Sequence, residues 1–476
     1  MHTLPATRIA VNSIMKQNHT SAQRCDALSL RECLAASGGT RVLITGNDVF
    51  PNIPLLLGDN YPSQTVFLIA DTNTMEAAGN DLEKMLLASG IPIAGSYIFP
   101  GEPRLHAEYG YIETLKKTIA GYNSPVPLAV GSGTINDIAK RAAGELELPY
   151  LCVPTAASVD GYTSFGSAIL KDGHKQTLPC AAPRCVVADT GILSRAPSWL
   201  SSSGFADLAG KINAGADWII ADAAAAFGAK GANRIDSKAW AMVQYSLYDY
   251  LGRSATAAQG DEDALKALFE ALSITGFAMQ YARDSRPVSG SEHLLAHVWE
   301  MEDLCVNGNP VTHGHKVAIG TLAAIAFLEV LFSGSDAPPP LPPSFRRQSL
   351  ADRISEVRLA FNGSPALDSV VITSTEKFHD DAAIKKISEG FRDTWKEIRE
   401  KVLSQIIPYA ELKSMLLKAL CPVQPAEVNL SRAAVIGCIR RARMIRNRYN
   451  GIDLAADLGC FDTVLSRMET SEIYLY

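Results

Sequence analysis

The chain has 476 residues, and its 44 Lys and Arg residues against 50 Asp and Glu give a formal net charge of −6. Hydrophobic residues make up 47% and charged residues 20%, which is typical of a soluble globular protein and excludes a disordered one. A mildly acidic chain has no basic field that would favour binding to nucleic acid or a membrane surface. The length predicts two or three domains.

The cysteines and the N-terminal residues indicate a reduced, cytoplasmic setting. The nine cysteines form no C-x-x-C pair, which excludes a zinc ribbon and a thioredoxin-type redox motif. Residues 1–20 contain no apolar run, so we expect no secretory signal. The longest apolar stretch, residues 317–332, includes Glu329 and is shorter than the ~20 residues of a membrane span. We therefore expect this stretch to be a buried core helix.

An N-terminal extension, residues 1–36, leads into a first helix, and from Arg41 strand-like and helix-like patterns alternate. Short apolar runs with turn residues nearby predict strands buried on both faces at 41–45, 66–70, 127–130 and 150–153. Helical spacing occurs between them at 74–88 and 108–120. This order predicts an α/β domain over residues 37–190, with a parallel sheet and helical crossovers. Residues 167–170 and 185–188 are interpreted as a small hairpin.

The second half, residues 191–476, is predicted to be mostly helical. Alanine-rich helices are expected at 204–230, 237–252, 262–283, 292–302 and 316–332, and a charged, solvated helix at 377–402. The run 333–345 holds five prolines and is interpreted as a loop or linker. A single strand signal remains in this half, at 370–373.

A glycine turn follows the predicted strand at 127–130 and opens a helix. Glycines let the backbone approach a phosphate, and amides at a helix N-terminus face an anion. Because Asn136 stands where the dinucleotide fingerprint has its third glycine, an ordinary strand-to-helix turn is an equal alternative. The candidate cofactor-binding residues are Gly131, Ser132, Gly133, Thr134 and Asp137.

Two further segments follow predicted strands. Asp71 ends the strand at 66–70 and has the chemistry to bind a ribose hydroxyl, although it serves equally well as an N-cap. Thr155, Ser158 and Asp160 follow the strand at 150–153, where open parallel sheets bind ligands. Small hydroxyl residues and one carboxylate suit a cofactor or a polyhydroxylated ligand, and the alternative is an ordinary loop.

Four of the nine histidines lie within 23 residues: His293, His297, His313 and His315. His293 and His297 are four apart, so a helix places them on one face. Asp207 opens a long apolar helix, where an acid alone would only favour the helix dipole. One carboxylate and two imidazoles with an open position form a pattern for a catalytic divalent metal. The clustering favours a metal site over isolated structural histidines.

In this order, the segments G-S-G-T-I-N-D, P-T-A-A-S-V-D-G-Y-T-S, G-F-A-D-L-A-G-K, G-S-E-H-L-L-A-H and H-G-H-K-V-A-I-G resemble one family. It is the sn-glycerol-1-phosphate dehydrogenase family, within the superfamily of iron-containing alcohol dehydrogenases and dehydroquinate synthases. The resemblance covers roughly residues 38–330, fades over the proline-rich loop and returns at 439–459.

The resemblance implies a Rossmann-like nucleotide-binding domain, an all-helical metal-binding domain and an active site in the cleft between them. It implies NAD(H) or NADP(H) on the glycine turn, with Asp71 mildly favouring NAD(H) by repelling a 2′-phosphate. It also implies a divalent ion, Zn²⁺ or alternatively Ni²⁺ or Fe²⁺, held by Asp207, His293 and His313. His297 would lie beside the site, and Asp160 near the substrate hydroxyls.

The implied activity is reduction of dihydroxyacetone phosphate to sn-glycerol 1-phosphate by metal-assisted hydride transfer. Lys211 and Lys175 are the candidate partners of the substrate phosphate, with His315 next. The alternatives are a dehydroquinate synthase-like cyclase, a dehydrogenase of another polyol or polyol phosphate, and a degenerate relative that only binds nucleotide. Asp207, where the synthases have glutamate, favours a dehydrogenase. We expect a homo-oligomer with a small-molecule substrate.

Overall fold

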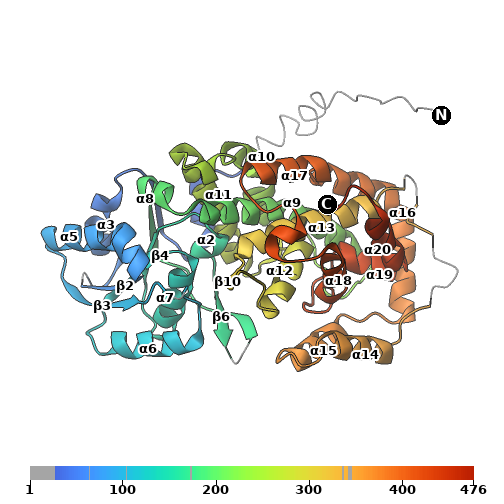
Figure 1. The fold of residues 1–476 in the computed structure, drawn as a ribbon, viewed down its shortest axis with the longest axis horizontal. Helices are drawn as coiled ribbons and strands as arrows, with labels where there is room; N and C mark the ends of the chain where they lie inside the picture. Colours follow the sequence, from blue (N-terminus) through green and yellow to red (C-terminus); the bar gives the residue numbers. More distant parts are fainter. Residues whose placement is uncertain are drawn as a thin grey trace.

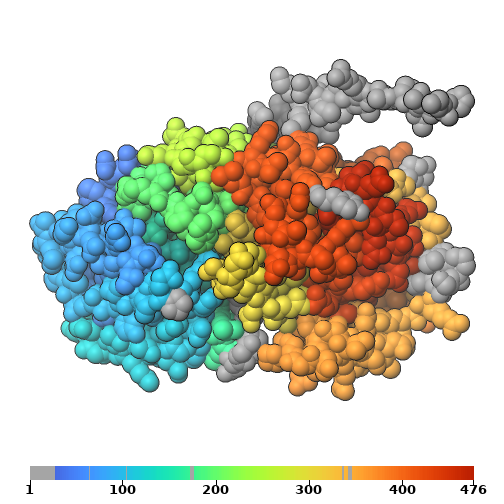
Figure 2. Space-filling view, in the orientation of Figure 1, coloured from blue at the N-terminus to red at the C-terminus, as the bar shows by residue number. Residues whose placement is uncertain are grey.

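The structure, a computed structural model, describes residues 27–475 except 64, 103, 172–173, 335–336 and 341–345, and the side chains of residues 174 and 175 are also left out. Strands gather in the N-terminal half and helices fill the C-terminal half, and the two halves lie side by side along the longest axis (Figure 1). In the space-filling view, a yellow segment lies between the cyan surface of the first half and the red surface of the second (Figure 2).

Within the described residues, six strands form one sheet in the order β1-β8-β5-β4-β2-β3. Every neighbouring pair is parallel, as the sequence predicts. Four of the strands lie where the apolar runs predict them; the side chains of β2, β4 and β5 are largely buried on both faces, whereas those of the edge strand β1 are half-buried. The strands are β1 (Val42–Gly46), β2 (Val66–Asp71), β3 (Ile93–Phe99), β4 (Val126–Gly131), β5 (Leu151–Pro154) and β8 (Cys185–Asp189).

Helices cover both faces of this sheet because alternate strand residues point in opposite directions. On one face, Leu68 and Leu128 pack with α3 (Ile53–Asn60) and α5 (Asn80–Ala88). On the other face, Phe67 and Ala129 pack with α6 (Tyr109–Ala120) and α7 (Gly133–Glu145). The shorter connections are η1 (Phe50–Asn52), α4 (Thr72–Thr74), the π-helical turn η2 (Met75–Gly79), η3 (Asp160–Tyr162) and α8 (Thr190–Arg195).

Two strand predictions are wrong, and four strands among the described residues were missed: β3, β7 (His174–Leu178), β9 (Cys305–Val306) and β10 (Asn309–Pro310). The run at 167–170 pairs with β7, as β6 (Ser167–Lys171), while the run at 185–188 belongs to the main sheet. The β-branched run at 370–373 lies in helix α15 (Leu367–Glu376), because tertiary packing outweighs a weak strand propensity. The edge strand β3 mixes polar and apolar residues and shows no continuous apolar run.

The C-terminal half is helical, as predicted, and a short hairpin of β9 (Cys305–Val306) and β10 (Asn309–Pro310) joins two of its helices. Helix α2 (Leu30–Ser37), which the sequence placed with the extension, packs on α11. The longer helices are α9 (Ser198–Ala226), α10 (Ser237–Arg253), α11 (Glu262–Ala282), α12 (Ser291–Met301), α13 (His313–Leu331), α14 (Leu350–Ala360), α16 (Asp381–Gln405), α17 (Tyr409–Lys418), α18 (Arg432–Ala442), α19 (Gly451–Asp457) and α20 (Phe461–Thr470). The 3-10 turns are η4 (Ala257–Gln259), η5 (Arg286–Val288) and η6 (Pro425–Val428).

Helix α13 forms the centre of this half, packed against α9 and α12. It is the one helix among the described residues that is long and apolar enough to cross a membrane by length and composition, but 89% of its most apolar window is buried inside the protein. The predicted core helix is therefore confirmed, and it starts at His313, earlier than the sequence predicts. The fold class is also confirmed, whereas the domain limits of 37–190 and 191–476 stay a prediction.

Candidate active site

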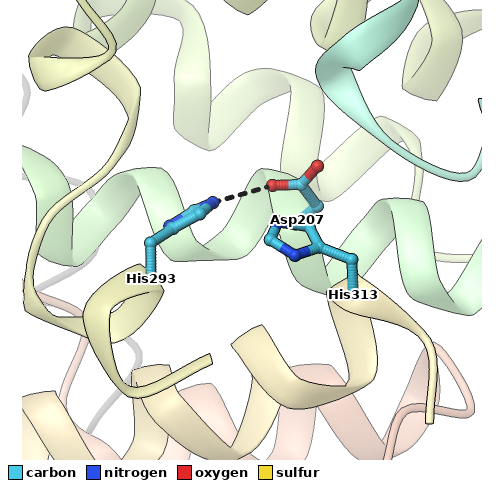
Figure 3. A group of neighbouring side chains, drawn as sticks. All are labelled: Asp207, His293 and His313. Atoms are coloured by element: carbon cyan, nitrogen blue, oxygen red, sulfur yellow. Dashed lines mark ion pairs between the residues drawn. The ribbon is translucent and has the colours of Figure 1, made fainter. Parts of the chain in front are cut away.

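Three side chains from three helices converge at the junction of the two halves: Asp207 of α9, His293 of α12 and His313 at the start of α13 (Figure 3). One ligand atom from each lies within 4.8 Å of the others. His293 Nε2 is 3.3 Å from Asp207 Oδ1, and the rings of His293 and His313 have centroids 5.3 Å apart. The sequence named these residues, and the fold brings all three together.

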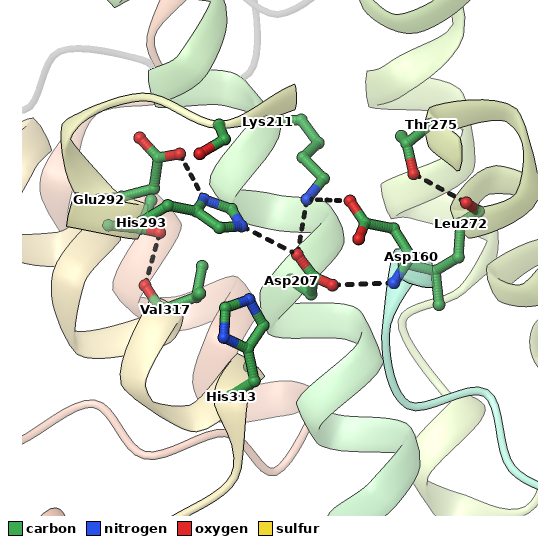
Figure 4. Close-up of polar contacts among 12 residues, drawn as sticks. Asp160, Asp207, Lys211, Leu272, Thr275, Glu292, His293, His313 and Val317 are labelled. Atoms are coloured by element: carbon green, nitrogen blue, oxygen red, sulfur yellow. Dashed lines mark hydrogen bonds and ion pairs between the residues drawn. The ribbon is translucent and has the colours of Figure 1, made fainter. Parts of the chain in front are cut away.

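The far nitrogen of each imidazole is held by a buried glutamate. His293 Nδ1 lies 2.6 Å from Glu292 Oε1 (Figure 4). His313 Nδ1 lies 2.8 Å from Glu300 Oε1. Glu292 also accepts hydrogen bonds from the Gly290 amide and from Asn213. Metal-binding histidines usually donate their second N–H to such a carboxylate, which fixes the ring and leaves Nε2 for the ion. Sequence reasoning missed both glutamates.

Asp207 is completely buried and held from both sides. Its Oδ1 accepts from Lys211 Nζ at 2.5 Å, and its Oδ2 accepts from the backbone amide of Asp160 at 3.0 Å (Figure 4). Burial alone would raise the pKa of Asp207, but Lys211 and the two imidazoles lower it well below its usual range. The carboxylate is therefore ionised, which is the form that binds a metal.

The donor set fits a divalent metal ion. Asp207 offers a carboxylate oxygen, and His293 and His313 each offer a ring nitrogen, while the carboxylates of Glu292 and Glu300 hold the far side of the two rings. A carboxylate and two imidazoles suit Zn²⁺ and other imidazole-binding transition metals.

The backbone around His313 explains its position. Thr312 caps α13 by accepting from the His315 amide. A Cβ on Gly314 would lie 1.8 Å from the carbonyl oxygen of Ser203, so only glycine lets α13 approach α9 this closely. The H-G-H motif therefore brings its first imidazole against the helix that carries Asp207.

The other two histidines of the cluster have different roles. His297 Nδ1 lies 3.0 Å from Glu300 Oε2, and its ring centroid is 6.0 Å from that of His313. Burial lowers the pKa of His297 to about 4, so its imidazole is neutral near pH 7. His315 points elsewhere, with Nε2 2.7 Å from Ser202 Oγ, and burial followed by Arg104 lowers its pKa to about 4. A neutral His315 does not supply the cation that the sequence considered.

A cavity of about 600 Å³ opens beside Asp207, His293 and His313. His293, His297, His313 and Asp160 line it, together with Gly133 of the glycine turn. A second cavity of about 1170 Å³ adjoins it, and the two share lining residues that include Ser132, Thr134 and Arg104. One continuous space therefore runs from the glycine turn to the cluster of histidines.

All the predicted cofactor residues except Gly131 line this space. Asp71 and Thr155 line the larger cavity, and Asp137 and Ser158 line the smaller one. Asp71 also accepts from the Thr74 amide at 2.8 Å, so the N-cap interpretation holds as well. The glycine turn is sterically tight, because a Cβ on Gly131 would lie 2.6 Å from the side chain of Ile135.

The structure gives less support to the residues predicted to bind the substrate phosphate. Lys211 is wrong as a phosphate partner: it is fully buried and paired with Asp160 at 2.8 Å as well as with Asp207. The side chain of Lys175 lies outside the described residues. Arg446 does line the smaller cavity, and we find no hydrogen bond or ion pair for it among the described residues. Sequence reasoning noted its Arg-rich segment without assigning this residue.

Proteins of known name are similar to this chain in sequence and in fold. Residues 44–197 match the family model described as iron-containing alcohol dehydrogenase. The glycerol-1-phosphate dehydrogenase [NAD(P)+] of Methanothrix thermoacetophila is 32% identical over 292 residues, which cover 59% of this chain and 75% of the relative. The chain belongs to the glycerol-1-phosphate dehydrogenase family. The enzyme of the same name from Bacillus velezensis is 37% identical over 254 residues, covering 52% of this chain and 62% of that protein. The chain thus spans less than two thirds of that Bacillus relative.

Solved structures share the fold of this chain over nearly the whole length of the chain. The glycerol dehydrogenase of Schizosaccharomyces pombe superposes with a TM-score of 0.57 at 17% identity, covering 92% of this chain and 94% of that one. Sulfoacetaldehyde reductase from Bifidobacterium kashiwanohense, solved in complex with NAD+, gives a TM-score of 0.54 at 15% identity, covering 91% and 98%. The α/β half and the helical half therefore occur together in this fold.

Proposed function

We propose that the chain reduces dihydroxyacetone phosphate to sn-glycerol 1-phosphate with NADH or NADPH at a divalent metal site. The observation that carries the proposal is the set of Asp207, His293 and His313, which faces a cavity continuous with the glycine turn. Relatives named glycerol-1-phosphate dehydrogenase [NAD(P)+] support the choice of substrate and cofactor. We propose Zn²⁺ as the ion, with Ni²⁺ and Fe²⁺ as alternatives.

The chain's own residues bind and orient the substrate. The ion would act as a Lewis acid on the ketone, and the nicotinamide would supply the hydride. Asp160, fixed by Lys211, accepts hydrogen bonds from substrate hydroxyls at the cavity wall. His297 donates from Nδ1 to Glu300, which leaves Nε2 as an acceptor for the substrate. Arg446 offers a guanidinium to the phosphate.

The cofactor occupies the larger cavity, with its pyrophosphate on the amides that begin α7. Ser132 is the N-cap of α7, and its side chain makes no capping hydrogen bond. The backbone amides of this first turn therefore suit an anion. Asp71 at the far side of the same cavity favours NADH over NADPH, because its carboxylate would repel a 2′-phosphate.

A cofactor-oxidation assay tests the proposal. The purified chain, loaded with Zn²⁺, is given dihydroxyacetone phosphate and NADH or NADPH, and the chirality of the glycerol phosphate is determined. We expect one NADH consumed per product and only the sn-1 enantiomer. Formation of a product without net NADH loss would instead support a cyclase, and turnover of unphosphorylated polyols alone would indicate a different dehydrogenase. We also propose that the protein is cytoplasmic and forms a homo-oligomer. Light scattering on the purified chain tests the oligomeric state.

A further inference from the structure

A second polar cavity lies in the C-terminal half, away from the cluster of histidines. It has a volume of about 280 Å³ and is enclosed by α14, α15, α18, α19 and α20 with the segment before α14. We call it the basic cavity. Its six Arg and Lys residues are Arg346, Arg347, Arg353, Lys377, Arg440 and Arg443. Its four acidic residues are Glu356, Asp453, Asp457 and Asp462.

Each acidic residue of this cavity is already paired with a basic side chain. Lys377 Nζ lies 2.9 Å from Asp453, Arg440 lies 2.6 Å from Asp462, and Arg353 lies 3.2 Å from Glu356. The fourth acid, Asp457, pairs with His379 at 3.1 Å.

Three guanidinium groups are left with weak compensation or none. Arg346 makes no ion pair or hydrogen bond with any other described residue. Arg443 reaches only Asp453, at 3.7 Å, and that carboxylate is closer to Lys377. Arg347 approaches Asp381 at 3.9 Å. In a chain whose net charge is −6, this cavity therefore carries a local excess of positive charge.

Burial and the neighbouring arginines lower the pKa values of two buried cations in this cavity. The pKa of Lys377 falls to about 8, first because of burial and further because Arg443 and Arg353 lie close, although Asp453 opposes the change. Burial, followed by repulsion from Arg443, lowers the pKa of Arg353 to about 10. An added anion would stabilise the protonated, positively charged forms of both side chains.

The chemistry of the lining residues selects the ligand. Guanidinium groups bind phosphate oxygens in pairs and lose little entropy in doing so. The volume of the basic cavity lies just below ~300 Å³, the lower limit of pockets that hold drug-sized ligands. A whole dinucleotide is therefore too large to fit in it. We propose that the basic cavity binds a phosphate group, either as inorganic phosphate or on a small organic phosphate, between Arg346, Arg347 and Arg443.

The segment between α18 and α19 connects this site to the proposed active site. Arg443 and Asp453 at its two ends line the basic cavity, whereas Arg446 and Arg448 between them line the cavity of the histidines. Lys377 Nζ also donates to the carbonyl oxygen of Arg448 at 3.3 Å. A phosphate bound in the basic cavity therefore acts on the same segment that presents Arg446 to the substrate.

Calorimetric titration of the full-length, metal-loaded chain tests the proposal. The probes are inorganic phosphate and, separately, 3-phosphoglycerate, which distinguish a free phosphate from an organic one. The variants are Arg346→Gln, Arg443→Gln and the double variant, and the matched control is Arg358→Gln, an exposed arginine of α14 outside the cavity. We expect at least a tenfold loss of affinity in the double variant and wild-type binding in the control.

The variant Arg446→Gln separates the two cavities. Because Arg446 belongs to the cavity of the histidines, this change leaves phosphate binding in the basic cavity intact. The proposal is overturned if wild type binds neither probe, if the double variant binds as wild type, or if Arg446→Gln alone abolishes binding. Arg346 is exposed and makes no described contact, so Arg346→Gln folds normally and by itself gives a several-fold loss if the proposal holds.

Discussion

At the scale of single residues, Glu300 holds two histidines at once. One carboxylate oxygen contacts His313 and the other contacts His297. In Glu300→Gln an amide replaces the carboxylate, so the imidazoles lose their charged partner and their fixed orientation. We expect metal affinity to fall by about 10- to 100-fold, the usual cost of removing such a partner. Competition with a chromogenic zinc chelator measures it.

The matched control for this variant is Glu302→Gln. Glu302 lies two residues further along, is 41% exposed and pairs with Arg441 rather than with a histidine. Its loss should leave metal affinity unchanged. Equal effects of the two substitutions would mean that the result reflects general loss of negative charge, and Glu300 would have no positioning role.

The convergence of the proposed metal-binding residues could be predicted from sequence, whereas their partners could not. Asp207, His293 and His313 stand in short motifs with ligand chemistry, so local pattern sufficed. Glu300 follows His297 by three residues but reaches His313 only because α12 and α13 pack together. Lys211 was misjudged for the same reason, since nothing local indicates that Asp160 lies 2.8 Å from its ammonium.

At the scale of elements, the approach of α13 to α9 determines whether the site forms. Gly314→Ala would place a methyl group 1.8 Å from the Ser203 carbonyl oxygen, and the backbone cannot give way cheaply. We expect α13 to shift, with a loss of about 1–3 kcal/mol in the free energy of unfolding and weaker metal binding. Denaturant unfolding and chelator competition measure the two effects.

Gly437→Ala is the control for that substitution. Gly437 lies inside α18, and a Cβ there would meet no atom within 4 Å. Alanine in a helix interior is favoured over glycine by roughly 1 kcal/mol, so this variant should be slightly more stable than wild type. If both glycine variants lost stability alike, close packing at Gly314 would not be the cause.

The elements also show which patterns are informative. Three of the apolar runs were recognisable because their strands, β2, β4 and β5, are buried on both faces of a parallel sheet, whereas β1 is half-buried at its edge. Alanine-rich helices were recognisable by length. Strand β3 lies at the edge of the sheet, where one side needs no apolar continuity. The segment at 370–373 has β-branched residues, yet Val370 packs with Val357 in a helical pair, which the local sequence does not reveal.

At the scale of the whole molecule, buried thiols make stability depend on alkaline pH. Burial, as the largest cause in each case, raises the pKa of Cys33, Cys152 and Cys460 to about 12, from an ordinary value near 9. Between these values the folded state keeps protons that the unfolded chain has lost. Stability is therefore fully present below pH 9 and falls as the pH rises toward 12. Lys377, with its pKa lowered to about 8, acts in the opposite direction, as do Arg286 and Arg353, with pKa values lowered to about 10, mainly above that pH.

Guanidinium unfolding at pH 8 and pH 10 measures this dependence. We expect a lower midpoint at pH 10, and a smaller difference between the two midpoints when Cys33, Cys152 and Cys460 are replaced by alanine. The triple variant has a lower stability at both pH values, because side chains are removed from the core, so only the difference bears on the thiols. An unchanged difference would assign the alkaline loss to other buried thiols, such as Cys421 and Cys438, whose pKa values burial also raises.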